Sequence, residues 1–294
     1  MAAVTAKMVG ELRQMTGQGM MECKKALVEA EGDMKKAEEI LRVKSGNKAQ
    51  KLAGRQAAEG VIAVCVEGKA GALVEINCET DFVAKDESFK AFADKAARAV
   101  LQNRPKDVQA AMGLSVDGGT LEEARQALIA RLRENISLRR FEVLDGAPKI
   151  DSYMHNSSIG VLVAYEGAES AAHDAAMQVA AMRPRFLNEA AVDAETIETE
   201  RRVAEEKMKK EEEEKGKKAS EEIAKKRIEG SVRKFIKEST LMGQAFVKDE
   251  KKSVAQYLKE SGTTVKAYAV LKVGEGIERK EVDYAAEVAA AAKI

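Results

Sequence analysis

An acid and a large aromatic residue stand side by side where a predicted strand ends and a helix begins. Asp81 can form a turn, cap the helix or act as an exposed carboxylate, and Phe82 can fill the core or anchor the chain in a partner's pocket. For an arbitrary sequence the buried position is the more common one. Asp81 paired with Asp86 or Glu87 would suit hydrolysis, but no nucleophile, base and orienting group accompany such a pair. The segment therefore favours a binding role over a hydrolytic one.

Side chains for metal or covalent catalysis are scarce in the rest of the chain. His155 and His173 are its only histidines, and no two potential ligands have the spacing of a metal site. There is no phosphate-binding loop or nucleophile elbow, and residues 274–276 (GEG) lack the third glycine of a dinucleotide turn. The three cysteines match neither a zinc ribbon nor a redox pair, so we expect them to be buried apolar residues. We expect a protein that is not an enzyme and holds no metal or cofactor.

The composition is typical of a folded, helix-rich chain of the α+β class. Of the 294 residues, 45% are hydrophobic but only 4% are aromatic, a mixture that favours helices over β sandwiches. Acidic and basic residues cancel at 49 each, so the totals do not indicate direct nucleic-acid binding. The N-terminus lacks a signal-peptide pattern, and no apolar run approaches the roughly 20 residues that span a bilayer. We expect a cytoplasmic protein that binds neither a membrane nor nucleic acid directly.

The N-terminal part has apolar residues three and four positions apart, as in short helices. Helices are predicted at residues 5–14, at 20–30 and from residue 33 onward. Glycines near residues 17 and 32 supply the breaks, because glycine tolerates positive φ. Residues 1–55 are expected to form a three-helix, ubiquitin-associated-like (UBA-like) domain, with the polar residues 44–56 as a tether to the next domain.

A β-hairpin is predicted to open the first of two α+β core subdomains, residues 56–145. Two β-rich runs, residues 61–66 and 72–78, flank a connection that contains glycine. Amphipathic helices at 87–101 and 121–135 should cover one face of the sheet.

The second core subdomain is predicted to be interrupted, and to consist of residues 146–182 and 231–273. Its expected elements are strands at 159–165 and 265–273 and helices at 171–182 and 253–258. Glycines at 274 and 276 then break the chain before an Ala-rich helix at 281–293. We expect residues 274–294 to form a C-terminal helical module that docks on a partner.

The interruption, residues 183–230, is rich in Glu, Lys, Arg and Ala. A thin apolar stripe on either side of its centre predicts an antiparallel helical, coiled-coil-like hairpin with a turn at residues 214–217. A solvated single helix or a partly disordered charge run is the alternative. Little within one chain could cover the stripe, so we expect the hairpin to offer a surface for a homodimer.

Matches to one known family run along nearly the whole chain. The longest are residues 16–27 (TGQGMMECKKAL) and 75–84 (EINCETDFVA). Shorter ones are 135–136, 139–140, 152–155, 159–163, Leu241, 243–244 and 274–278. These residues resemble bacterial elongation factor Ts, the nucleotide-exchange factor of elongation factor Tu. The charged segment and residues 156–158 depart from the family pattern.

The resemblance implies a guanine-nucleotide exchange factor of translation elongation, which would bind elongation factor Tu in its GDP-bound and nucleotide-free forms. It implies that Thr80, Asp81, Phe82 and Val83 form a loop that enters the G domain near its magnesium and phosphate site. Phe82 would wedge between helices there, and Asp81 would perturb the surroundings of the magnesium.

Other contacts with elongation factor Tu follow from the same resemblance. Met20 and Met21 would touch the G domain, with a place in the helix core as the structural alternative. His155 would face a second domain of the partner unless it is a purely structural histidine. Gly276 and Ile277 would open the module that docks on a G-domain helix, and the charged hairpin resembles the family's dimerisation element.

An adaptor that binds the ribosome or a ubiquitin-like protein, without exchange activity, is the alternative function. The three-helix domain and its basic residues favour it. Those residues are Lys24, Lys25, Lys35 and Lys36. Salt-sensitive RNA binding would support this alternative.

Overall fold

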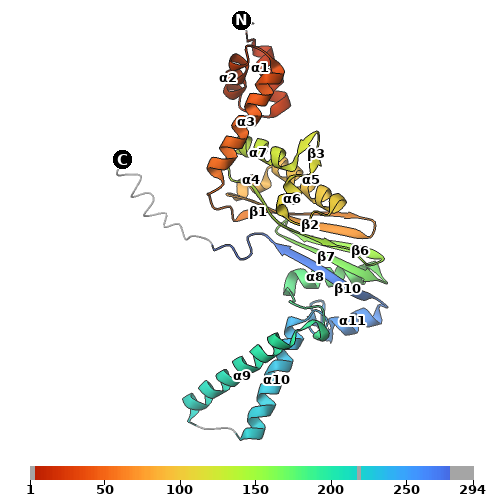
Figure 1. The fold of residues 1–294 in the computed structure, drawn as a ribbon. Coiled ribbons are helices and arrows are strands. Elements are labelled where there is room, and N and C mark those ends of the chain that lie inside the picture. The colour runs from red at the N-terminus through yellow and green to blue at the C-terminus, as the bar shows by residue number, and fades with distance from the viewer. Residues whose placement is uncertain (1–3, 217–219, 279–294) are drawn as a thin grey trace.

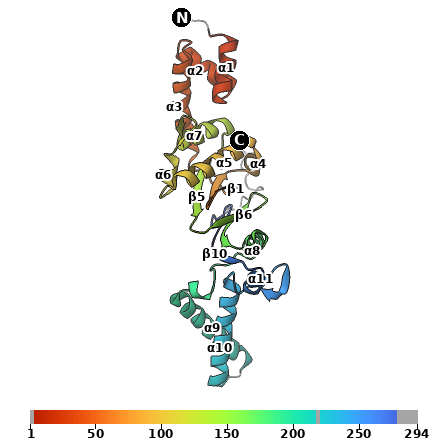
Figure 2. The ribbon, with the colours of Figure 1, turned by 90° about the vertical axis from the view of Figure 1, so that its right-hand side faces the viewer.

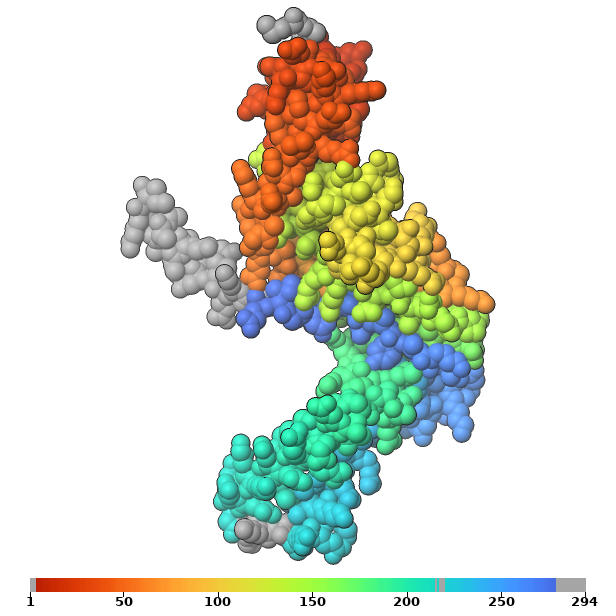
Figure 3. All heavy atoms as spheres, in the orientation of Figure 1, coloured from red at the N-terminus to blue at the C-terminus, as the bar shows by residue number. Residues whose placement is uncertain are grey.

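The computed structural model describes residues 4–216 and 220–278. The molecule is elongated, with a three-helix unit at one end and a pair of long helices at the other (Figures 1 and 2). Its mixture of helices and antiparallel sheets confirms the α+β class. In the surface view, the outline is hollowed between the central body and the pair of long helices (Figure 3). In these described ranges, no helix is both long and apolar enough to cross a membrane.

Three helices form the N-terminal unit. They are α1 (Ala6–Thr16), α2 (Met20–Glu29) and α3 (Met34–Leu52). Gly17 ends α1 in the left-handed conformation at φ +67°, and the Asp33 carboxylate caps α3 by accepting from two backbone amides. Leu12 and Leu27 are fully buried in the small core between these helices. All three helices were predicted, because both the periodicity and the breaks are local.

The predicted tether at residues 44–56 is wrong over most of its length. The helix α3 continues to Leu52 and packs against α7 (Leu121–Leu132) of the central body. Ala49 is buried in the same apolar cluster as Leu128 of α7. Small side chains on one face let the two helices approach, and this contact depends on residues about 80 positions away.

Two three-stranded antiparallel sheets form the centre of the molecule. The first has the order β1 (Glu59–Glu67), β2 (Ala70–Cys78), β5 (Ser137–Leu144), and the second has the order β10 (Thr264–Lys272), β7 (Ile159–Glu166), β6 (Lys149–His155). The pairing of β1 with β2, with Val64 opposite Leu73, confirms the predicted hairpin. Strand β6 was not predicted, because Asp151 and Ser152 interrupt its apolar pattern.

Helices cover the outer face of each sheet, so the centre has four layers (Figure 1). The helix α5 (Glu87–Asn103) lies with α7 over the first sheet, and α8 (Glu169–Met182) lies over the second. The two sheets face each other across a cluster of four buried residues. These are Ile62, Leu73, Leu162 and Leu271. Strand β2 lies in the middle of its sheet between two layers and is therefore buried along its whole length.

The sheets approach closely at two glycines. A Cβ atom on Gly160 would lie 2.6 Å from Cγ2 of Ile62, and one on Gly71 would lie 2.8 Å from Cδ2 of Leu162. Both distances are too short for van der Waals contact between carbon atoms. The absence of a side chain at these positions is therefore what allows the two sheets to pack.

Substitution of Gly160 by alanine is expected to lower the free energy of unfolding by about 1–3 kcal/mol, the usual cost of overfilling a core. The matched control is Gly230→Ala in α10 (Glu221–Ser239), because a Cβ atom on Gly230 would meet no atom within 4 Å. That change should stabilise the helix by up to about 1 kcal/mol. Urea unfolding followed by circular dichroism measures both, and equal stability of Gly160→Ala and the parent would refute the packing argument.

The remaining elements are short or lie in the charged region. They are α4 (Asp81–Lys85), α6 (Val108–Met112), β3 (Ser115–Val116), β4 (Gly119–Thr120), η1 (Glu189–Ala191), α9 (Ala194–Lys215), β8 (Ala245–Phe246), β9 (Asp249–Ser253) and α11 (Val254–Glu260). The helices α9 and α10 contact each other and project from the body (Figure 1). Gly216, at φ +63°, ends α9 within the predicted turn. The predicted helix at 281–293 lies outside the described residues.

The three cysteines are unpaired thiols. Cys23 and Cys78 are buried, as predicted, but Cys65 is only half-buried. The prediction is wrong for Cys65 because it lies near the end of β1, an outer strand whose last residues are exposed.

Candidate partner-binding site

Residues 80–83 form the start of a short helix rather than the expected loop. Thr80 is its N-cap, and the hydroxyl oxygen of Thr80 accepts a hydrogen bond from the backbone amide of Val83 at 3.4 Å. Val83 is buried against the first core, while Asp81 and Phe82 are exposed. Successive helical residues point about 100° apart, so burial of Val83 turns its neighbour Phe82 outward.

Phe82 is 81% exposed, so the alternative of a ring buried in the core is wrong. Among the residues that the structure describes, no other phenylalanine or tyrosine is exposed. An isolated aromatic ring in water contributes nothing to the core, whereas aromatic side chains are enriched among the residues that dominate binding interfaces. The position of Phe82 is the arrangement that a binding anchor requires.

The carboxylate of Asp81 lies next to the ring, on the same exposed helix. The Lys85 ammonium donates to it at 2.6 Å and lies 6.0 Å from the centroid of the Phe82 ring. The hydrogen bond from Lys85 lowers the pKa of the Asp81 carboxyl below its usual value. At neutral pH the tip of α4 therefore presents a charged carboxylate beside an aromatic ring.

Met20 and Met21 begin α2 and are 55% and 62% exposed. A place in the helix core is therefore wrong for both. Gly17 ends α1 and Gly19 caps α2, so the turn between these glycines leads directly to the two methionines. Cys23, Ala26 and Leu27 occupy the buried face of α2. Flexible thioether side chains at the surface adapt well to a partner.

His155 ends β6 and is exposed. Its Nδ1 atom lies 3.3 Å from the hydroxyl oxygen of Tyr153, and the two rings stack with their centroids 6.3 Å apart. The structure places His155 on the second sheet, Phe82 beside the first, and Met20 on the N-terminal unit. These residues do not gather in one pocket, and a partner would have to contact them along an extended surface.

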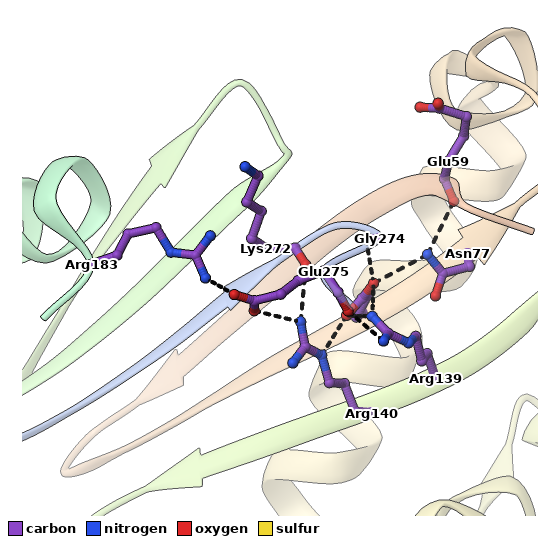
Figure 4. A network of polar contacts seen from close by, with 9 residues as sticks. Glu59, Asn77, Arg139, Arg140, Arg183, Lys272, Gly274 and Glu275 are labelled. Atoms are coloured by element: carbon purple, nitrogen blue, oxygen red, sulfur yellow. Dashed lines mark hydrogen bonds and ion pairs between the residues drawn. The ribbon is translucent and has the colours of Figure 1, made fainter. Parts of the chain in front are cut away.

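Gly276 and Ile277 follow β10 at the edge of the described residues, and the chain before them is held by a partly buried ionic network (Figure 4). Glu75 of β2 is fully buried, and its carboxylate accepts from Arg140 at 2.6 Å, Arg139 at 3.0 Å and the backbone amide of Gly274 at 2.8 Å. Burial alone would raise the pKa of Glu75, but these hydrogen bonds outweigh it and lower the pKa below its usual value.

A second carboxylate extends the network across the two sheets. Glu275 pairs with Arg140 at 3.2 Å and with Arg183, the residue that ends α8. Arg139 also donates to the backbone carbonyl of Glu275 at 2.5 Å. Sequence reasoning did not assign a role to any of these residues. Together they join the first sheet, the end of β10 and the end of α8, and so fix where the C-terminal segment leaves the body.

Binding of a metal ion and binding of another protein require different groups of side chains. Within the described part of the chain, no group of three or more histidine, cysteine, aspartate or glutamate side chains is placed to hold a metal ion. The arrangement offers an aromatic anchor, a carboxylate and flexible apolar side chains, which are the parts of a surface that binds another protein.

Comparison with known proteins gives the same family over the whole chain. The family model described as elongation factor TS matches residues 79–275, which include the Phe82 helix. Elongation factor Ts of Chromobacterium violaceum is 53% identical over 294 residues, covering 100% of both chains. The protein of the same name from Ralstonia pickettii is 54% identical over 290 residues, covering 99% of this chain and 97% of the relative. That of Neisseria meningitidis serogroup A is 53% identical over 296 residues, with both chains fully covered. The chain therefore belongs to the elongation factor Ts family.

Proposed function

We propose that the chain releases GDP from elongation factor Tu by inserting the tip of α4 into the G domain near its magnesium and phosphate site. As an elongation factor Ts, the chain is a guanine-nucleotide exchange factor for elongation factor Tu in translation elongation. The exposure of Phe82 carries the proposal, because it leaves a full aromatic ring available for a pocket on the partner.

The proposed mechanism needs no covalent chemistry. Magnesium bridges phosphate oxygens and protein in guanine-nucleotide sites, so a wedge and a negative charge nearby weaken the hold on GDP. Phe82 would separate helices of the G domain, and Asp81 would disturb the shell of the ion. Linkage requires that the factor bind nucleotide-free partner more tightly than nucleotide-bound partner. GTP then expels the factor with the same coupling free energy, and the cycle closes.

Further contacts are proposed at the other exposed positions. Met20 and Met21 would touch the G domain, and His155 would face a second domain of elongation factor Tu. Gly276 and Ile277 would lead the C-terminal module to a helix of the G domain. The ionic network before Gly276 supports this role, because it gives that segment a fixed origin.

We also propose that the chain is organised as five parts that follow the expected boundaries. These are residues 1–55, 56–145, 146–182 with 231–273, 183–230 and 274–294. The helix α10 crosses the boundary at 230 and continues to Ser239. Ile223 remains exposed on α10, which supports pairing of two copies through α9 and α10. Sedimentation of the parent and Ile223→Lys would test this pairing, and an unchanged monomer in both would oppose it.

The function is tested by loading elongation factor Tu with a fluorescent GDP and adding this chain with excess unlabelled GTP. The proposed function predicts faster loss of fluorescence in proportion to the concentration of the factor. An adaptor without exchange activity predicts no acceleration.

Substitution of Asp81 by asparagine is expected to slow GDP release by about fivefold or more, the lower end of coupling between two binding sites. The neutral side chain keeps its size but no longer acts on the magnesium, so the difference from the parent should shrink when the metal is chelated. The control is Glu222→Gln on α10. Glu222 pairs with Lys226 at the same spacing, with a separation of 2.7 Å against 2.6 Å for Asp81 and Lys85. Equal release rates for Asp81→Asn and the parent would rule out the charge mechanism.

A further inference from the structure

The pairing of β2 with β5 ends at Asn77 and Ser137, and beyond this pair the two backbone segments diverge. The segment after β2 leads into α4, and the segment before β5 comes from the end of α7. Backbone amides at such a divergence have lost their partners in the ladder and must bond elsewhere or to water.

There, the carboxylates of two glutamates take the place of the strand-to-strand hydrogen bonds. Each carboxylate accepts from the backbone of the segment that carries the other glutamate. The carboxylate of Glu134 accepts from the backbone amides of Glu79 and Thr80, both at 3.0 Å, and from the Thr80 hydroxyl at 2.6 Å. In return, the carboxylate of Glu79 accepts from the backbone amide of Asn135 at 2.6 Å. The side chain of Asn135 donates to the backbone carbonyl of Arg55 at 2.7 Å, just beyond α3. The segment that follows α7 therefore holds both the start of α4 and the end of the N-terminal unit in place.

We propose that Glu134 is a positioning residue that fixes the direction in which α4 presents Phe82. This inference rests on the proposed function. Thr80 transmits the constraint, because its hydroxyl donates to Glu134 while accepting from Val83 in the first turn of α4. Glu134 does not itself need to touch elongation factor Tu.

The helix α4 needs such an external support. It has five residues, of which only Val83 is buried. So short a helix is not stable by itself. Only Val83 and the partly buried Ala84 of α4 pack on the core, so few apolar contacts oppose tilting of its axis. A tip that samples many directions must lose that freedom on binding, which lowers affinity and rate, whereas a preorganised tip does not. Glu134 supplies three hydrogen bonds to the residues at which this tilting would begin.

The test is a double-mutant cycle in the full chain, measured as release of fluorescent GDP from elongation factor Tu at subsaturating factor. Glu134→Ala is expected to slow release about tenfold, equivalent to about 1.4 kcal/mol. In a background that lacks both active groups of α4, Asp81→Asn together with Phe82→Ala, the same change should cost less than about twofold, because a positioning residue acts only through the groups that it positions. Equal losses in both backgrounds, or no loss from Glu134→Ala, would overturn the inference. No loss from Phe82→Ala alone would instead overturn the proposed function.

Two further variants separate positioning from general stability. Glu134→Gln retains an oxygen that can accept from both amides and an NH₂ group that can donate to Thr80, so it should release GDP within about twofold of the parent. Glu122→Ala is the matched control on α7, the helix that Glu134 follows, because the carboxylate of Glu122 binds Arg125 and Gln126 rather than α4. A loss from Glu122→Ala as large as that from Glu134→Ala would contradict positioning. If Glu134→Ala does not fold, Glu134→Asp, whose shorter side chain cannot reach all three donors, allows the same cycle.

Discussion

Phe82→Ala is expected to slow GDP release from elongation factor Tu about 30-fold at subsaturating factor. Truncation of an aromatic anchor at an interface costs about 2 kcal/mol or more, and every 1.4 kcal/mol corresponds to about a factor of ten. The ring is 81% exposed in the free chain, so its removal takes little area out of the core. The rate should fall while the free energy of unfolding changes by less than about 0.5 kcal/mol.

Met182→Ala controls for the loss of an exposed apolar side chain, because Met182 is 52% exposed at the end of α8. Its release rate should equal that of the parent. The account of Phe82 is wrong if the two variants behave alike, or if Phe82→Ala loses stability in proportion to its loss of rate.

Glu75→Ala is expected to lower the free energy of unfolding by about 3 kcal/mol. Removal of one partner from a buried ion pair costs about 3–5 kcal/mol, because the charges left behind lose their compensation. Here the lower end applies, since Arg139 and Arg140 retain partial contact with solvent. The change also leaves the backbone amide of Gly274 without its acceptor. Urea unfolding measures the loss, and Glu222→Ala, from an exposed pair, should cost less than about 1 kcal/mol.

The pH dependence of the Glu75 contribution has a definite sign. Its hydrogen bonds to Arg140, Gly274 and Arg139 outweigh burial and hold the folded-state pKa below the ordinary value of 4.5. The stabilisation is therefore fully present above the ordinary value and is lost as pH falls through the lower folded-state pKa. Unfolding free energies measured from pH 7 downward should fall more steeply in the parent than in Glu75→Ala. Parallel curves would show that Glu75 is not stabilised as a carboxylate.

Elements governed by nearby residues could be predicted from the sequence. The β1–β2 hairpin followed from two apolar runs around a glycine-bearing connection. A helix was also predicted at residues 253–258, where the structure has α11 with a capping box between Ser253 and Gln256. The extension of α3 could not be predicted in this way. Its residues 44–52 are polar and basic, and the helix is stabilised there by contact with α7, far along the chain.

The position of the candidate site in the chain could be predicted from the sequence, but the exposure of its side chains and the contacts that support it could not. Asp81 and Phe82 stood out at the end of a strand, but local pattern does not decide whether a ring is buried or exposed. The supporting groups were missed because their partners are distant. Glu134 is 54 residues from Thr80, and Glu75 is 199 residues from Gly274. Only the register of β2 with β5 and the course of β10 bring these groups together.

The most direct test of the account is whether the ring at position 82 becomes buried when the complex forms. With 4-fluorophenylalanine placed at position 82 alone, the ¹⁹F resonance reports on the surroundings of that ring. The account predicts that a soluble paramagnetic agent broadens the resonance in the free chain, and that nucleotide-free elongation factor Tu shifts the resonance and protects it. A resonance that stays unshifted and unprotected in a fully formed complex would contradict the claim that Phe82 enters elongation factor Tu.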